Sequence, residues 1–212
     1  MLRTALLACC LALAGYASAA WLTHDFQVWT AEGARRLEVA QQPVPLPPVT
    51  VDGAGIAAQL LPTFLAQGGG VTLVDFVYTR CQTVCLSLGS SFQQMQAALQ
   101  ADRAAGAASK VRLLSISFDG AHDSPAVLQA YAHKLQADPT VWRWVRVPDA
   151  TQQQALLHAL GVVVVPDGRG DFEHNAALLV VDAQGRMVRV FDLAEQQLAL
   201  DYARHLAKGG RL

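Results

Sequence analysis

The 212-residue chain has little charge and no excess of either sign. Charged residues make up 16% of it, and the formal net charge is −1. The sequence contains no basic patch with interleaved aromatic residues, no glycine-rich loop that could cradle a phosphate, and no internal repeat. These absences argue against a nucleic-acid partner, because nucleic-acid binding relies on clustered positive charge.

Cysteine is also scarce in the part of the chain expected to fold. Of the 4 cysteines, Cys9 and Cys10 lie in an apolar leader, which leaves only Cys81 and Cys85 for the folded body. Two cysteines are too few for a scaffold held together by disulfides. The pair therefore points to thiol reactivity or metal binding, with a structural short-loop disulfide as the alternative.

Residues 1–22 predict export. Arg3 is followed by an uncharged run from Thr4 to Leu22, and Ala17-Ser18-Ala19 is an acceptable cleavage site for a signal peptide. The run is also long enough to span a bilayer, with Arg3 on the cytoplasmic side. A cleaved signal peptide and a retained membrane anchor both remain open, with the anchor slightly favoured. Cys9 makes a poor lipoprotein site, because only eight residues precede it.

The remaining chain divides into a tether and one domain. Residues 23–48 can form one short helix and then a proline-rich spacer, QQPVPLPP, which should be extended and semi-rigid. The domain is expected over 49–212, a length typical of a single domain. Its first element, within 56–65, is either a short strand or a helical turn.

Strand and helix patterns alternate from Val71 onward. Ser124 and Pro125 form a strong helix start, as N-cap and first helical residue. We expect strands at 71–78, 111–118, 141–147, 176–181 and 187–191, and helices at 87–105, 126–136, 149–160 and 194–207. This order predicts an α/β fold of the thioredoxin-like kind, with a central mixed sheet flanked by helices.

The buried strand at 71–78 delivers both body cysteines to the start of a helix. Cys81 and Cys85 are four residues apart, so on a helix their Cβ atoms would lie ~5–6 Å apart on one face. That spacing suits a disulfide or a shared metal ion, and a helix N-terminus favours the thiolate that either chemistry needs. Three intervening residues, rather than two, count against a general dithiol oxidoreductase. Two thiolates suit Cu(I), and an added imidazole would extend the site to Cu(II).

The chain has 6 histidines, of which His174 is the best candidate for that imidazole. His24 lies in the tether, and His133, His158 and His205 lie in expected helices as surface or packing residues. His122 and His174 fall in expected loops. His174 ends a long polar connection, 168–174, just before a strand, and such loops bring side chains over the end of a sheet. An exposed loop histidine is the alternative.

Three motifs in order resemble the SCO/SenC family of thioredoxin-like copper proteins. They are the C-x3-C pair, Cys81-Gln-Thr-Val-Cys85, after a strand ending in Phe-x-Tyr-Thr; the loop SISFDGAHDSP; and His174 ahead of ALLVVDAQGRMV. The resemblance covers 71–191, most of the domain.

The resemblance implies copper bound by Cys81, Cys85 and His174, with Asp119 as a nearby accessory residue. It further implies a metallochaperone that helps assemble the CuA centre of cytochrome c oxidase, on the periplasmic side of a bacterial inner membrane. Its partner would be a copper-receiving oxidase subunit or another copper chaperone. The alternative is a thiol–disulfide reductase, in which Cys81 and Cys85 are a redox-active pair that keeps a partner's copper-ligand cysteines reduced.

The chain also departs from the family pattern. Gln82 and Leu86 stand where the family usually has proline after each cysteine, which leaves a less constrained loop. His122 stands where an arginine is usual and could act as an alternative or extra ligand. Asp119 could equally be a loop or cap carboxylate. Thiol peroxidase and structural zinc are weaker alternatives, since a zinc site would need a fourth ligand.

Overall fold

The computed structural model describes residues 2–81, 84–107, 110–168 and 171–210, except for the side chains of 84–87. The chain forms two compact units, Met1–Gln42 and Pro43–Leu212. The second unit begins before the boundary expected near Val49, because part of the proline-rich segment pairs with the sheet.

The first unit consists of two helices, α1 (Leu2–Leu22) and α2 (Ala31–Gln41). α1 has 21 residues and is long and apolar enough to cross a membrane, a test that a signal sequence also passes. The side chain of Thr30 caps the start of α2 by accepting a hydrogen bond from the Gly33 amide at 3.0 Å. α2 is the short helix expected after the leader.

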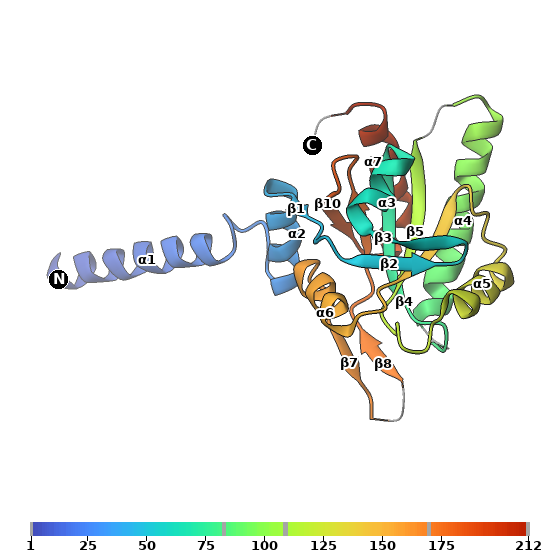
Figure 1. The fold of residues 1–212 in the computed structure, drawn as a ribbon. Helices are drawn as coiled ribbons and strands as arrows, with labels where there is room; N and C mark the ends of the chain where they lie inside the picture. The colour runs from blue at the N-terminus through green and yellow to red at the C-terminus, as the bar shows by residue number, and fades with distance from the viewer. Residues whose placement is uncertain (1, 82–83, 108–109, 169–170, 211–212) are drawn as a thin grey trace. The chain divides into compact units, whose positions relative to one another are not determined.

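An eight-stranded sheet forms the centre of the second unit (Figure 1). Three parallel strands occupy its middle: β4 (Val71–Val77), β5 (Val111–Ser117) and β6 (Trp142–Arg146). All seven residues of β4 are buried, as expected for a strand covered on both faces. The flanking strands pair antiparallel: β1 (Val44–Pro45), β2 (Thr50–Gly53), β3 (Ile56–Leu60), β9 (Leu178–Val181) and β10 (Arg186–Phe191).

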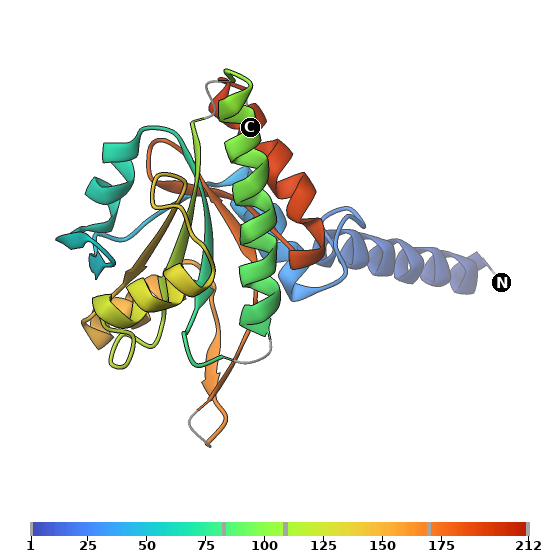
Figure 2. The same cartoon turned by 90° about the vertical axis from the view of Figure 1, so that its right-hand side faces the viewer.

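Helices cover both faces of this sheet. On one face, Phe92 of α4 (Val84–Ala104) packs on Trp142, and Tyr131 of α5 (Pro125–Lys134) packs on Trp144. α7 (Gln196–Ala207), which follows the 3-10 turn Leu193–Glu195, lies beside α4 on that side (Figure 2). α3 (Leu61–Gly68) lies against the other face and carries the buried Phe64. The layered, mixed α/β arrangement confirms the expected thioredoxin-like fold.

Local signals placed several helix starts correctly. The Ser124 side chain accepts a hydrogen bond from the Val127 amide, and Pro125 is the first residue of α5. Asp149 caps α6 (Ala150–Ala159) by accepting from the Gln152 amide at 2.8 Å. The segment 56–65 contains both of its expected alternatives in succession, β3 and then the start of α3.

Two short strand pairs were not expected from the sequence. Val44 of the proline-rich spacer pairs with Met187 in β10. The expected polar connection before His174 is a small hairpin, in which β7 (Val164–Pro166) pairs with β8 (Phe172–His174). Strands this short carry almost no period-2 signal, because β1, β7 and β8 have only two or three residues each.

Candidate metal centre

A buried carboxylate holds the loop that carries Cys81. Asp123 is 0% exposed and accepts from the amide and the hydroxyl of Thr79 at 3.0 and 2.6 Å, and from the hydroxyl of Ser117 at 2.6 Å. Thr79 follows β4, and Ser117 ends the neighbouring β5. Asp123 therefore ties together the carboxyl ends of the two central parallel strands, where the candidate site lies.

Cys81 is buried at this end of the sheet, close to a tyrosine. Its side chain is 6% exposed, and its amide donates to the carbonyl oxygen of Tyr78. Burial raises the pKa of Tyr78 to about 12, and the neighbouring Cys81 sulfur contributes to the rise. Tyr78 thus stays a neutral phenol beside the thiol, with its hydroxyl 3.4 Å from Asp171 Oδ1 and from the carbonyl oxygen of Phe172.

Aromatic packing brings His174 to the same place. The rings of His174 and Phe118 have centroids 5.0 Å apart, and Phe118 packs on Tyr78 at 5.2 Å. Phe172 contacts both Tyr78 and Phe118 edge-on. Burial lowers the pKa of His174, so its imidazole is neutral at neutral pH, which is the form that binds metals.

The second predicted sulfur ligand belongs to the first turn of α4, but the Cys85 side chain lies outside the described residues. Gln82 and the side chain of Leu86, the positions that lack the family prolines, lie outside them as well. Among the side chains that are described, no three of the His, Cys, Asp and Glu type are grouped so as to hold a metal ion. The three-ligand set of Cys81, Cys85 and His174 stays a prediction.

Asp119 has a charge-pairing role at the rim of this site. Its carboxylate is 6% exposed and lies 2.9 Å from Nη2 of Arg80 and 2.8 Å from Nδ1 of His122. The pairing with Asp119 raises the pKa of Arg80 further, so a fixed positive charge sits next to Cys81 in the chain. Positive charge near a thiol favours its thiolate. His122 directs Nδ1 to Asp119, and its side chain is 60% exposed.

Sequence reasoning missed Arg80 and Asp123 as parts of the site. Both adjoin motif residues, Arg80 directly before Cys81 and Asp123 directly after His122. Nothing in the spacing shows that Asp123 turns inward while His122 turns outward. Three other histidines lie in helices as expected, His133 in α5, His158 in α6 and His205 in α7.

Comparison with known proteins identifies the family. The SCO1/SenC family profile matches residues 66–207. The chain belongs to the SCO1/SenC family. A curated relative, the SCO1 protein homolog of Bacillus subtilis (strain 168), is 24% identical over 129 residues, which cover 60% of this chain and 64% of that protein's length.

Solved structures of Sco proteins share the fold. The copper-bound ScoI of Bradyrhizobium japonicum has a TM-score of 0.60 and 24% identity, covering 75% of this SCO1/SenC chain and 99% of ScoI. BsSco, whose structure is described as revealing a disulfide switch in a cytochrome c oxidase assembly protein, has a TM-score of 0.59 and 18% identity, covering 76% and 95%. The family resemblance carried by the three sequence motifs is therefore confirmed.

Proposed function

We propose that this SCO1/SenC protein binds copper as cargo and delivers it to the CuA centre of cytochrome c oxidase during assembly. The observation that carries the proposal is the meeting of Cys81 and a neutral His174 around one aromatic cluster, although they lie far apart in the sequence. Copper in the related ScoI and the oxidase-assembly role of BsSco support the choice of metal and partner. The partner is a copper-receiving oxidase subunit or another copper chaperone.

The donor set fits this cargo. We assign Cys81, Cys85 and His174 as the ligands, because two thiolates hold Cu(I) and an added imidazole accommodates Cu(II). α4 begins at Val84, so its N-terminal dipole lies beside both cysteines and favours their thiolates. Copper binding then displaces the thiol protons. In this arrangement Asp119 positions Arg80, and His122 remains on Asp119 rather than on the metal.

An anaerobic copper titration of the reduced full-length protein in detergent tests the assignment. We expect about one Cu(I) per chain, and loss of Cu(I) binding when Cys81→Ser and Cys85→Ser are combined. His174→Ala removes the imidazole, one of three proposed ligands. It should therefore weaken Cu(II) binding at least tenfold, while the two thiolates largely maintain Cu(I) binding. His158→Ala, at an exposed helical position, is the matched control and should bind like the parent.

The assignment fails if the reduced protein takes up no copper, or if the double serine variant retains full uptake. If His174→Ala and His158→Ala give the same Cu(II) affinity, the assignment of His174 as a ligand is wrong, whereas that of the two cysteines stands.

A second function, thiol–disulfide reduction of a partner's copper-ligand cysteines, is favoured by the helix-mouth position of the cysteine pair and by the disulfide switch described for BsSco. It predicts metal-free turnover of a disulfide substrate with reversible formation of a Cys81–Cys85 bridge. His174→Ala should leave that turnover unchanged, whereas it should weaken Cu(II) binding. His174→Ala thus separates the two functions, which one protein can combine.

We further propose that the protein acts on the periplasmic side of a bacterial inner membrane. α1 is the support for this location, since it has the length and composition of a membrane span and carries Arg3 near its start.

A further inference from the structure

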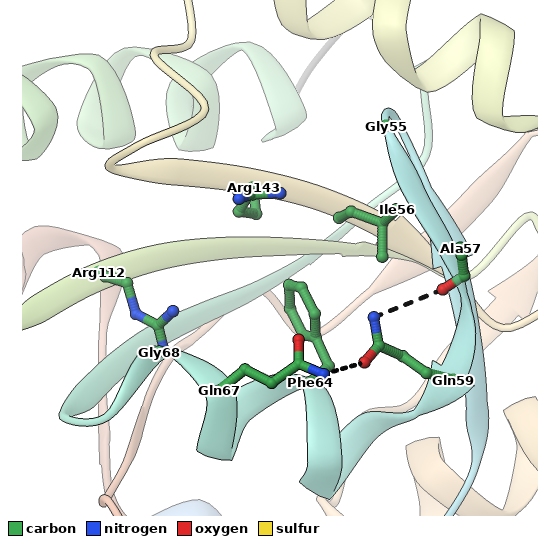
Figure 3. A pocket seen from close by; sticks show the side chains of 9 residues that line it. All are labelled: Gly55, Ile56, Ala57, Gln59, Phe64, Gln67, Gly68, Arg112 and Arg143. Atoms are coloured by element: carbon green, nitrogen blue, oxygen red, sulfur yellow. Dashed lines mark hydrogen bonds between the residues drawn. The ribbon is translucent and has the colours of Figure 1, made fainter.

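A pocket of about 370 Å³ opens in the second unit, away from the cysteine site (Figure 3). It lies between α3, the β2–β3 hairpin and the first residues of β5 and β6. Arg112 stands near the start of β5, whereas Phe118 of the candidate metal centre follows the end of that strand. Six residues of extended chain separate them, or about 20 Å. The pocket and the metal centre are therefore different sites.

Two arginines from neighbouring strands face this pocket together. In the parallel ladder Arg143 lies opposite Leu114, and Leu114 is two residues from Arg112, so both arginines project from the same face of the sheet. The Arg143 side chain makes no hydrogen bond or ion pair with any residue that the structure describes. Arg112 donates from Nη2 to the carbonyl oxygen of Leu65 at 3.1 Å, while its Nε is buried without an acceptor among the described residues.

No carboxylate among the described residues pairs with either guanidinium of this pocket. Burial lowers the pKa of Arg112, and the positive charges of Arg143 and Arg103 lower it further. Four other arginines of the same unit pair with an aspartate: Arg80 with Asp119, Arg146 with Asp52, Arg186 with Asp182, and Arg204 with Asp102. The pocket thus contains two guanidinium groups that are partly buried and have no carboxylate partner among the described residues. An anion bound there would neutralise their positive charge.

The walls of the pocket hold Arg112 in place. Its guanidinium occupies the space that a Cβ atom of residue 68 would fill, which Gly68 leaves open. The bond to Leu65 adds a second restraint, because it ties the guanidinium to one of the last four carbonyls of α3. A guanidinium fixed in this way loses little conformational freedom when it binds a ligand.

The other walls are apolar or amide in character. Phe64 and Ile56 are nearly buried and line the pocket floor. The Gln67 side-chain amide donates to Oε1 of Gln59 at 2.8 Å. Figure 3 shows the Gln67 side chain running from beside Gly68 toward Gln59, which lies on the side away from Arg112. The pocket therefore combines two cationic side chains, Arg112 and Arg143, with an apolar surface formed by Phe64 and Ile56.

We propose that this pocket binds a small organic carboxylate, with its charge on Arg112 and Arg143 and its carbon frame on Phe64 and Ile56. Guanidinium forks match carboxylates in a bidentate geometry, and two of them suit a short dicarboxylate. The apolar floor favours a carbon frame over an inorganic oxyanion. A volume of about 370 Å³ is within the usual range for small-molecule pockets.

Calorimetric titration of the full-length protein in detergent with succinate tests the proposal. We expect one saturable succinate site per chain, and at least a tenfold loss of affinity in Arg143→Gln, which removes a charge without breaking any described hydrogen bond. Gly68→Ala keeps both charges but displaces the Arg112 guanidinium, and it should weaken binding similarly. Arg189→Gln, at an exposed arginine of β10, is the matched control and should bind like the parent.

The proposal is overturned if succinate does not bind, or if Arg143→Gln and Arg189→Gln bind it equally well. It is also overturned if inorganic phosphate binds this site as tightly as succinate does, because the apolar floor then plays no part. Circular dichroism of each variant establishes that the fold is intact, and unchanged Cu(I) uptake by Arg143→Gln would show that this site is independent of the proposed copper centre.

Discussion

Asp75 is a carboxyl group inside the central sheet. It lies in β4, is 1% exposed, and faces Ser115 across the β4–β5 ladder. Neither carboxyl oxygen has a well-formed hydrogen bond to a described residue. The Ser115 oxygen already accepts from Nε1 of Trp142 at 2.9 Å, and its hydroxyl offsets the burial only in part. Burial therefore raises the pKa of Asp75 to about 7.

This shift gives Asp75 a definite effect on stability. In the unfolded chain the carboxyl ionises near pH 3.8, whereas in the folded protein it ionises near pH 7. Folding therefore has no penalty from this group below pH 4, a penalty that grows between pH 4 and 7, and the full penalty above pH 7. We expect Asp75→Asn to stabilise the protein at pH 8, by at most about 4 kcal/mol, and to change little at pH 4.

Urea unfolding of the parent and of Asp75→Asn at several values between pH 4 and pH 8 measures this difference. Asp201→Asn, at an exposed carboxylate of α7, is the control and should follow the parent. Parallel stability curves for the parent and Asp75→Asn would contradict the expectation.

At the scale of elements, the Asp123 loop joins the two parallel strands that carry the candidate metal centre. Asp123→Ala would leave the Thr79 amide, the Thr79 hydroxyl and the Ser117 hydroxyl without their buried acceptor. We expect a loss of about 3 kcal/mol in the free energy of unfolding, together with faster hydrogen exchange at the Thr79 amide.

The matched control for this loop is Asp149→Ala, which removes the N-cap of α6. It should cost about 1 kcal/mol and leave exchange at Thr79 unchanged. Urea unfolding and amide exchange measured by NMR distinguish the two variants. Equal exchange at Thr79 in both would show that Asp123 does not restrain the Cys81 loop.

The long elements could be predicted from the sequence, and the short ones could not. The continuous apolar run of β4 and the Ser124-Pro125 start of α5 are signals carried by neighbouring residues. The β7–β8 hairpin depends instead on pairing between Val164 and His174, across the 168–174 connection that reads as a polar loop. The position of His174 was therefore predicted from its motif, but its strand was not.

At the scale of the whole molecule, the proposed location of the protein depends on the first unit. α1 is uncharged after Arg3 and has 21 residues, enough to span a bilayer. If it is a retained anchor, the protein expressed in a bacterial host should stay in the membrane pellet after an alkaline wash, with the mass of the uncleaved chain. Release into the soluble periplasmic fraction, with a new N-terminus after Ala19, would show that the segment is a cleaved signal peptide.

The sequence by itself determined the fold class, the order of the main elements and the family, because each is recorded in local patterns: apolar runs, helix caps and three short motifs. It also singled out Cys81, Cys85 and His174. Only the tertiary structure decided that Asp75 is buried, that Asp123 rather than His122 turns inward, and that Arg112 and Arg143 share a pocket. These features depend on strand register and on helix packing between distant segments, so the burial and charge of each group are properties of the assembled sheet.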